Sequence, residues 1–543
     1  MNNYTSIKPA TKEKKSATKN SIMRVFLVAV AILLQCYFLY LVLVQIEKNY
    51  EWVDQVARMA ALLLCIALFS MNKTASMKMP WFILMLTFPI AGTMIYLIVG
   101  LNGSSRRMRR RFEDIDARLF PYIRQDPKVI KKMEEKDHTV ANMSRYIARH
   151  APFPVYDDSD IEFFSCAADA LEAQKDALRK AEKFIFMEYH AIENAESFAE
   201  IKEILTEKAA EGLDVRIFYD DIGSIAFINT DFIREMRSRG VQCRVFNPVI
   251  PLVNVFLNNR DHRKITVVDG KVGFTGGYNL ANEYFNITHP YGYWKDTGVK
   301  ITGNAVRNLT MMFLEMWNAI RSKDKDDEDY EPFFPELEYT QKEEGALIQP
   351  YGDTPLDSEH VGENVYLNAI SSAERYVWII TPYLVITDEM NRAMGLAAER
   401  GVDVRIITPG IPDKRTIYTV TRSYYQRLVR DGVRIFEYTP GFCHAKQLIA
   451  DDRVALCGTI NFDFRSLYHH FEDGVLFTNC KAVQDMKADF EHCFPLCMEV
   501  TKKYKKNTEF TSERLEQHSS VVLLVTVKIE AETQCNPGEY GLC

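Results

Sequence analysis

Long apolar segments dominate the first hundred residues of the chain. They run from Val25 to Ile46, from Val56 to Met71 and from Trp81 to Leu101, and polar residues separate them. A hydrocarbon core of about 30 Å is crossed by about 20 helical residues. The first segment is too long for the apolar part of a cleaved signal peptide, and no small-residue cleavage site follows it. Pro89 in the third is tolerated in a membrane helix. The pattern predicts two to three transmembrane helices within residues 25–104 of a multi-pass protein of the cell membrane.

Clusters of basic residues flank this apolar region on both sides. Residues 1–24 form a basic tail, and Arg106, Arg107, Arg109, Arg110 and Arg111 open a basic connecting segment, 105–150. The positive-inside rule places the arginine cluster, and the soluble part of the chain after it, on the cytoplasmic face. Three crossings would then put the basic tail outside, against the same rule, so the number of crossings and the side of the N-terminus stay open. The arginines either contact anionic lipid head groups or form a solvated flank.

From residue 151 the pattern changes to short apolar runs that alternate with helical periodicity, and it occurs twice. Three stretches of the first copy match three of the second: Ala181 to His190 with Ala373 to Tyr383, Glu207 to Ser224 with Leu396 to Asp413, and Ser238 to Pro248 with Arg430 to Pro440. Alternating strands and helices predict βαβ units, and hence an α/β fold with largely parallel sheets and outer helices. The halves are expected at 151–322 and 348–510. An acidic, exposed linker is expected at 323–347, and the tail at 511–543 is given no function.

Composition narrows the classes of protein. Hydrophobic residues make up 47% and charged residues 26% of the 543 residues, which is typical of folded chains. The net charge of -7 disfavours a general nucleic-acid binder. Eleven cysteines without C-x-x-C pairs indicate thiols in a reducing compartment and no zinc site.

Each copy ends in the same polar motif. Copy one contains His262, Lys264, Asp269, Gly276 and Asn279, and copy two contains His444, Lys446, Asp451, Gly458 and Asn461. In both, 17 residues separate the histidine from the asparagine. Two motifs in identical register are far stronger evidence than one, so we take them as the catalytic constellation.

The residue types of this motif suit chemistry at phosphorus. Histidine and lysine two residues apart lie on the same face of a strand. Lysine supplies charge and asparagine an amide donor for phosphoryl oxygens, so Lys264, Asn279, Lys446 and Asn461 are the expected phosphate-binding residues. If the halves face each other, one imidazole can attack phosphorus while the other protonates the leaving alkoxide. Two lysines replace the charge that Mg²⁺ supplies elsewhere, so we expect neither a metal nor another cofactor.

The carboxylates near the motifs have different predicted roles. Asp269 and Asp451 belong to the motif, yet each follows its lysine by an odd number of residues, so on a strand they face away from it and serve structure. Glu472 and Asp296 are the better candidates to orient the imidazoles, with Glu283 as an alternative in copy one. The other histidines, including His469 and His470, are expected to be surface or satisfied core residues.

These motifs identify a resemblance. H-R-K-I-T-V-V-D with G-G-Y-N, and H-A-K-Q-L-I-A-D with N-F-D-F-R-S, resemble the two signatures of the phospholipase D superfamily. The stretches MEYHAIE and TPYLVITDEM, and P-x-x-G-x-x-x-Y-x-x-x-G at Pro89 to Gly100, are similar to bacterial cardiolipin synthases. The resemblance covers about residues 56 to 500 and implies a duplicated phospholipase-D-type sandwich, with two pseudo-symmetric mixed sheets flanked by helices.

The same resemblance implies an activity. It would join two phosphatidylglycerols into cardiolipin, releasing glycerol, through a phosphatidyl-histidine. Its catalytic residues would be His262, Lys264, Asp269, His444, Lys446 and Asp451. By the family's usual assignment His262 is the nucleophile and His444 the acid and base, although the symmetry of the motifs leaves the reverse open. The implied partners are phosphatidylglycerol and anionic membrane lipids, and no nucleic acid.

Three other functions compete with this one. A phospholipase D would pass the phosphatidyl group to water and give phosphatidic acid. A membrane-anchored phosphodiesterase or nuclease could use the same motifs, but the apolar segments and the acidic charge disfavour a nucleic-acid groove. An inactive lipid-binding scaffold is disfavoured because both motifs are intact. Whether phosphatidylethanolamine can be a donor, and the oligomeric state, stay open.

Overall fold

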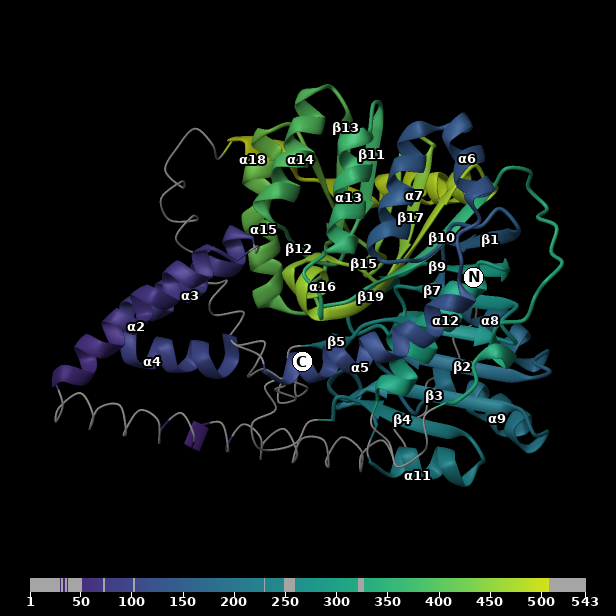
Figure 1. The fold of residues 1–543 in the computed structure, drawn as a ribbon. Helices are drawn as coiled ribbons and strands as arrows, with labels where there is room; N and C mark the ends of the chain where they lie inside the picture. The colour runs from purple at the N-terminus through teal and green to yellow at the C-terminus, as the bar shows by residue number, and fades with distance from the viewer. Residues whose placement is uncertain are drawn as a thin grey trace.

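Two α/β halves lie against each other, and a smaller group of apolar helices projects from them (Figure 1). The structure is a computed structural model that describes residues 51–71, 74–100, 103–228, 230–248, 259–320 and 327–506, with isolated residues 30, 33, 34 and 37. The predicted basic tail 1–24, most of the apolar segment from Val25 to Ile46 and the tail 511–543 therefore lie outside the described residues.

The first half is built on a seven-stranded sheet in the order β1-β9-β7-β6-β2-β3-β4. Its strands are β1 (Ser159–Phe164), β2 (Phe184–Tyr189), β3 (Asp214–Asp220), β4 (Gln242–Phe246), β6 (Lys264–Val268), β7 (Val272–Gly276) and β9 (Gly298–Gly303). Its helices are α8 (Ala167–Arg179), α9 (Glu196–Ala210), α11 (Thr230–Ser238) and α12 (Val306–Ala319).

The second sheet repeats this order as β10-β19-β17-β16-β11-β13-β14 and adds β20 at one edge. Its strands are β10 (Leu347–Asp353), β11 (Tyr376–Ile380), β13 (Asp403–Pro409), β14 (Arg434–Tyr438), β16 (Gln447–Ala450), β17 (Val454–Gly458), β19 (His470–Thr478) and β20 (Cys497–Glu499). Its helices are α13 (Val361–Ser372), α14 (Asp388–Glu399), α15 (Arg415–Arg430) and α17 (Lys481–Cys493). The same order in both halves is what a duplication predicts.

The expectation of largely parallel sheets is wrong for part of each half. Within the two main sheets, β2-β3-β4 and β11-β13-β14 are parallel, while the strands on the motif side pair antiparallel. The cause is the tight turn after each motif strand, at Asp269 and at Asp451, where the backbone takes positive φ. Such a turn returns the chain beside the strand that it has just left, which only antiparallel pairing allows.

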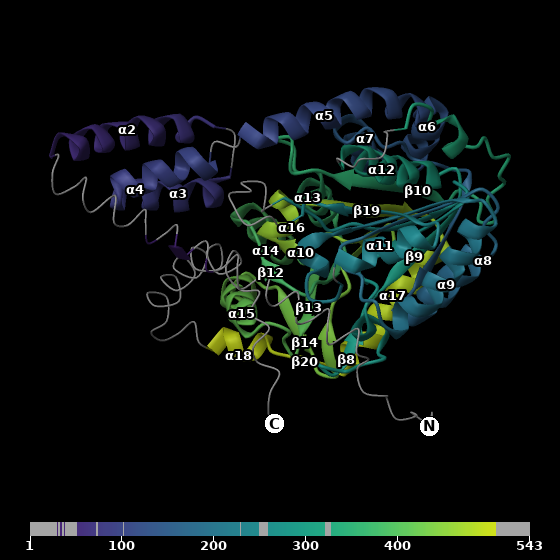
Figure 2. The same cartoon turned by 90° about the horizontal axis from the view of Figure 1, so that it is seen from below.

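The apolar region forms a small bundle of α2 (Glu51–Phe69), α3 (Ala75–Thr87) and α4 (Pro89–Ile95), followed by a π-helical turn, Tyr96–Gly100 (Figure 2). Among the described residues, one helix is long and apolar enough to cross a membrane, at Trp52–Phe69 with a mean hydropathy of 1.7. The apolar segment from Trp81 to Leu101 is not one continuous helix, because the helix breaks at Phe88. Pro89 disfavours helical φ and ψ at the residue before it and lacks the N–H that a continuing helix needs.

The basic connecting segment forms α5 (Gly103–Leu119), α6 (Pro127–Lys136) and α7 (His138–His150), which pack on the body of the molecule. Phe112, Ile115 and Leu119 of α5 are buried in the core that runs through both halves. Arg111 donates hydrogen bonds to the carbonyls of Asn318 and Ala319, at the C-terminal end of α12. Positive charge at that end complements the helix dipole, so this arginine holds α5 to the body.

The acidic segment at 323–347, expected to be an exposed linker, is partly buried. Tyr330, Phe333 and Phe334 are core residues, and Asp327 forms two hydrogen bonds, of 2.7 and 3.0 Å, with the guanidinium of Arg216. Arg216 also lies 4.9 Å from the ring centroid of Phe333. The segment therefore packs on the first half, where its acidic and aromatic residues find partners. Its composition alone does not reveal these partners.

Candidate active site

Each motif histidine follows a short strand that pairs with the other half. Strand β5 (Arg260–Asp261) pairs with β19, and the N–H of His262 donates to the carbonyl of Phe471 at 2.9 Å. Strand β15 (Gly441–Cys443) pairs with β8 (Tyr293–Lys295), and the N–H of His444 donates to the carbonyl of Lys295 at 2.7 Å. The backbones of the two halves are thus joined directly at the two histidines.

The carboxylates that hold the imidazoles also cross between the halves. Nδ1 of His262 lies 2.9 Å from both carboxylate oxygens of Glu472, and Nδ1 of His444 lies 2.7 Å from Oδ2 of Asp296. Both carboxylates are almost completely buried. A carboxylate that accepts the Nδ1 proton leaves Nε2 as the nitrogen with the free lone pair. The carboxylates that contact Nδ1 of the two histidines are therefore the two predicted ones, Glu472 and Asp296, and not the alternative, Glu283.

Room for the Asp296 carboxylate depends on a glycine. A Cβ atom at Gly277 would overlap Oδ1 of Asp296 and would lie 3.1 Å from the carbonyl oxygen of His444. Copy two has Thr459 at the corresponding position. The difference between G-G-Y-N and G-T-I-N is thus a steric requirement of the His444 side of the site.

The motif lysines lie beside the imidazoles, in surroundings that disfavour charge. Nζ of Lys446 lies 2.8 and 2.9 Å from the two ring nitrogens of His444, and each lysine donates to the carbonyl of its own motif histidine. Burial lowers the pKa of Lys446 to about 7 and that of Lys264 to about 8. Such values make the positive charge of both lysines sensitive to pH near neutrality.

The imidazoles are held neutral by the same surroundings. Burial, followed by Lys264 and Lys446, keeps the pKa of His262 well below its usual value. Burial and Lys446 lower the pKa of His444 to about 4, against the opposing effect of Asp296. Each imidazole thus responds to the lysine of the other half as well as to its own. The halves therefore form one electrostatic unit.

The two motif asparagines have different surroundings. Oδ1 of Asn279 accepts from the N–H of Ala191 at 3.1 Å, and its Nδ2 donates to the Tyr284 hydroxyl at 2.8 Å. Oδ1 of Asn461 is buried and has no hydrogen-bond partner among the described residues. Asn279 is therefore tied into the first half, while Asn461 retains hydrogen-bonding capacity for a ligand.

The motif aspartates bind backbone at the far end of the motif strands. Asp269 accepts from the N–H groups of residues 182, 183 and 184, and Asp451 accepts from those of residues 374, 375 and 376, at 2.7 to 2.9 Å. Asp269 follows Lys264 by five positions, so a rise of about 3.3 Å per residue places their Cα atoms roughly 16 Å apart. These contacts favour a structural role over the catalytic role that the motif implies.

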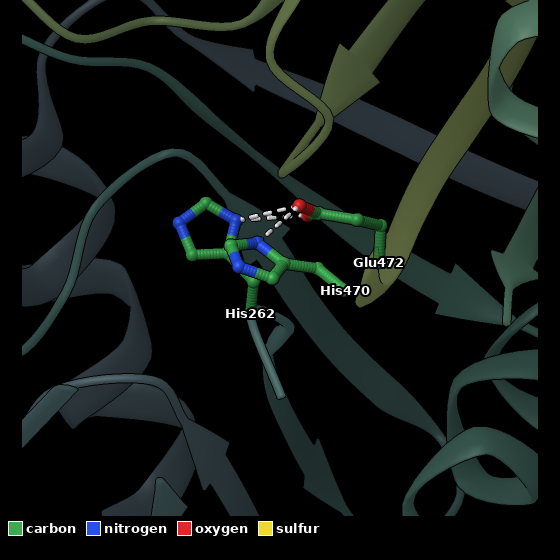
Figure 3. Close-up of side chains that lie close together, drawn as sticks. All are labelled: His262, His470 and Glu472. Carbon is green, nitrogen blue, oxygen red and sulfur yellow. Dashed lines mark hydrogen bonds and ion pairs between the residues drawn. The ribbon is translucent and has the colours of Figure 1, made fainter. Parts of the chain in front are cut away.

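Sequence reasoning missed two histidines and an arginine at this site. The rings of His190 and His470 lie 5.0 and 5.1 Å from that of His262. Nδ1 of His470 lies 3.3 Å from Oε1 of Glu472 (Figure 3). Nε of Arg465 donates to Nε2 of His470 at 3.0 Å. From the sequence, His470 is expected to be a surface or satisfied core residue. Its spacing of two residues from Glu472, which places both on one face of a strand, was the available signal.

A metal ion does not fit this group of side chains. One ligand atom each from His262, His470 and Glu472 lies within 4.8 Å of the others, a set that zinc uses elsewhere. However, Arg465 donates to Nε2 of His470, so Nδ1 carries the proton and has no lone pair for a metal. Lys264, Lys446 and Arg465 also place positive charge around His262. A divalent cation would therefore lack a lone pair on Nδ1 of His470 and would be repelled by the neighbouring positive charges.

Comparison with known proteins agrees with this arrangement. The family described as cardiolipin synthase, PLD-like domain, matches residues 175–317 and 366–494, one block in each half. The family described as phospholipase D-nuclease N-terminal matches residues 59–100, in the apolar bundle.

Relatives match over most of the chain. A cardiolipin synthase from Geobacillus thermodenitrificans is 33% identical and covers 78% of this chain and 85% of its own length. An uncharacterized protein from Streptococcus mutans is 39% identical over 83% of this chain and 95% of its own length. The crystal structure of phosphatidylserine synthase from Haemophilus influenzae superposes with a TM-score of 0.54 at 15% identity, over 73% of this chain and 98% of that one, which shows a shared fold. The chain belongs to the cardiolipin synthase family with a phospholipase-D-like domain.

Proposed function

We propose that this protein is a membrane-bound phosphatidyltransferase that moves a phosphatidyl group from one phosphatidylglycerol to another, giving cardiolipin and glycerol. The observation that carries the proposal is the crossed arrangement of the site: each half supplies one histidine and the carboxylate that holds the other half's histidine. Family membership supports the same reaction class.

The geometry supports a two-step displacement in which His262 is the nucleophile. Nε2 of His262 attacks phosphorus, the bond to the glycerol oxygen breaks, and His444 donates a proton to that alkoxide. The product of this step is glycerol and a phosphatidyl-histidine. His444, now neutral, then takes the proton from a hydroxyl of the second phosphatidylglycerol. That oxygen attacks phosphorus, and His262 leaves.

The lysines supply the charge that both steps need. Lys264 and Lys446 neutralise the phosphodiester as negative charge develops on its oxygens. A bound phosphate in turn offsets the positive field of the lysines, which is one reason for the low pKa of His444 in the free protein. Binding of lipid therefore favours the protonated state of His444 that the first step requires.

For the location of the catalytic body we propose the cytoplasmic face of a multi-pass membrane protein. Arg107, Arg109 and Arg110 are exposed on α5, close in sequence to the end of the apolar bundle. Charge of this sign next to a membrane helix is typical of cytoplasmic segments and attracts anionic lipids. Cysteine labelling of a residue before position 20 tests the number of crossings, and labelling at a residue of α6 tests the side of the body.

Reconstitution into vesicles of labelled phosphatidylglycerol tests the reaction itself. We expect cardiolipin and glycerol in equal amounts on thin-layer separation, and loss of at least about 10²-fold in rate for His262→Ala and for His444→Ala. Phosphatidic acid in place of cardiolipin would show hydrolysis and contradict the proposed transfer. Labelled phosphatidylethanolamine in a parallel assay shows whether it can be a donor.

A further inference from the structure

The two halves differ at one pair of equivalent positions beside the histidines. Counting two residues back from each orienting carboxylate gives His470 in the second half and Trp294 in the first. His470 lies opposite Arg260 in the β19–β5 pair, and Trp294 lies opposite Phe442 in the β8–β15 pair. Their rings lie 5.1 Å from His262 and 5.3 Å from His444. The same place therefore holds an imidazole on one side and an indole on the other.

The imidazole takes part in a chain of hydrogen bonds that the indole does not form. Nε of Arg465 donates to Nε2 of His470 at 3.0 Å, which fixes the proton of His470 on Nδ1. That Nδ1–H points at Oε1 of Glu472, 3.3 Å away, and Glu472 accepts from Nδ1 of His262. Nε1 of Trp294 is buried and has no hydrogen-bond partner among the described residues.

The backbone of Arg465 is fixed by the N-cap of its helix. Arg465 is the second residue of the short helix α16 (Phe464–His469), and its backbone N–H donates to Oδ1 of Asp463 at 2.8 Å. His470 is 8% exposed and Glu472 is fully buried. Buried hydrogen bonds of this kind restrict ring orientation more strongly than exposed ones, because no water can replace a lost partner.

We propose that His470 is a positioning residue of the transfer reaction: held by Arg465, it donates to Glu472 and thereby keeps His262 neutral and oriented as the nucleophile. This inference rests on the proposed function. It gives the two otherwise similar histidines a reason for different roles, because Asp296 has no second imidazole to share among the described residues.

The electrostatic reason is the identity of the second donor on each carboxylate. Glu472 divides its negative charge between two imidazoles, whereas Asp296 accepts from His444 and from the backbone N–H of Thr297 at 2.9 Å. A carboxylate shared by two imidazoles stabilises an imidazolium on either one less than a carboxylate that serves a single imidazole. Burial and the two motif lysines keep the pKa of His262 well below its usual value, whereas the pKa of His444 falls to about 4 against the opposing effect of Asp296. His444 is therefore suited to carry the proton and His262 to attack.

The test compares His470→Phe, His470→Asn and the matched control Trp294→Phe in phosphatidylglycerol vesicles that contain a chelator. Phenylalanine keeps the ring but removes the donor, so Glu472 acts on His262 alone. We expect kcat/KM at pH 7 to fall about 10-fold, and its acid limb to move about one unit toward neutral pH. Asparagine, which carries an N–H donor near the position of Nδ1, should restore most of both. Trp294→Phe should leave the acid limb where it is.

Several results would overturn the inference. They are an unchanged rate and acid limb in His470→Phe, an equal shift in Trp294→Phe, or failure of His470→Asn to restore either quantity while its melting temperature matches the wild type. Loss of wild-type activity with the chelator, and its return with Zn²⁺, would show that the three side chains hold a metal instead. If the wild type releases phosphatidic acid, the proposed function fails, yet the acid limb of that hydrolysis still tests the role of His470.

Discussion

At the scale of single residues, the site contains two buried lysines whose lowered pKa values let them lose their proton near neutral pH. Lys446 and Lys264 have pKa values lowered by burial to about 7 and about 8, so the free protein loses phosphate-binding charge as the pH rises through this range. A lysine with a lowered pKa is protonated below that value and neutral above it. Affinity for an anionic lipid should therefore fall on the alkaline side, because the lysines no longer neutralise the phosphate.

Arginine substitution tests which lysine sets this limit. In the wild type we expect kcat/KM to decline as the pH rises above about 7. Lys446→Arg keeps its charge at every accessible pH, so the decline should begin nearer pH 8, where Lys264 loses its proton, although the bulkier group should lower the maximum about 10-fold or more. The measurement is kcat/KM between pH 6 and 9.5 in vesicles of fixed composition.

The matched control is the other motif lysine. Lys264→Arg should leave the beginning of the decline near pH 7, since Lys446 still titrates there. If neither substitution moves the alkaline limb, that limb belongs to another group, and the lowered pKa values of the lysines do not govern activity.

At the scale of elements, the motif strands are fastened at their far ends by aspartates. Each aspartate binds three successive backbone N–H groups at the start of the neighbouring strand, β2 or β11, while its own backbone takes positive φ in the turn. The two ends of a motif strand thus have separate tasks: the histidine end carries chemistry, and the aspartate end fixes the register of the sheet.

Asp269→Ala should therefore lower stability more than turnover. Loss of a buried carboxylate leaves three N–H groups without their acceptor, which costs about 2–4 kcal/mol of the free energy of unfolding. We expect a lower melting temperature in detergent, with kcat per folded molecule within about threefold of the wild type. Asp451→Ala should behave alike. A wild-type melting temperature with a loss of 10²-fold in kcat would instead assign these residues to catalysis.

Local periodicity explains what the sequence could predict at this scale. The paired motifs and the placement of His262 and Lys264 on one strand face follow from spacing along the chain. Which carboxylate meets which histidine does not, because it depends on strand pairing between residues some 200 positions apart. The contact between Arg465 and His470 also escaped, because it depends on how the chain turns from α16 into β19.

At the scale of the whole molecule, the halves are interlocked as well as adjacent. Helix α12 of the first half packs under its own sheet and against β10 of the second, and α17 packs in the same way against its own sheet and β1. The core is continuous across the boundary. This packing of each helix against both sheets fixes the two motifs relative to each other within one chain. The Asp327–Arg216 contact also holds the acidic segment to the first half.

A mixing experiment tests whether one chain contains the complete site. His262→Ala and His444→Ala are produced together in cells that lack other cardiolipin synthases, with each chain carrying a different tag. Because β5 pairs with β19 and β15 pairs with β8 inside one chain, each mutant has one defective site and neither can supply its intact half to the other. We expect cardiolipin to stay at the level of either mutant alone, at most about 1% of the wild type. The double mutant expressed beside wild type serves as the control, and it should leave wild-type activity unchanged. Activity restored to a quarter or more of the wild type would mean that the halves exchange between chains, and the intramolecular site described above would have to be abandoned.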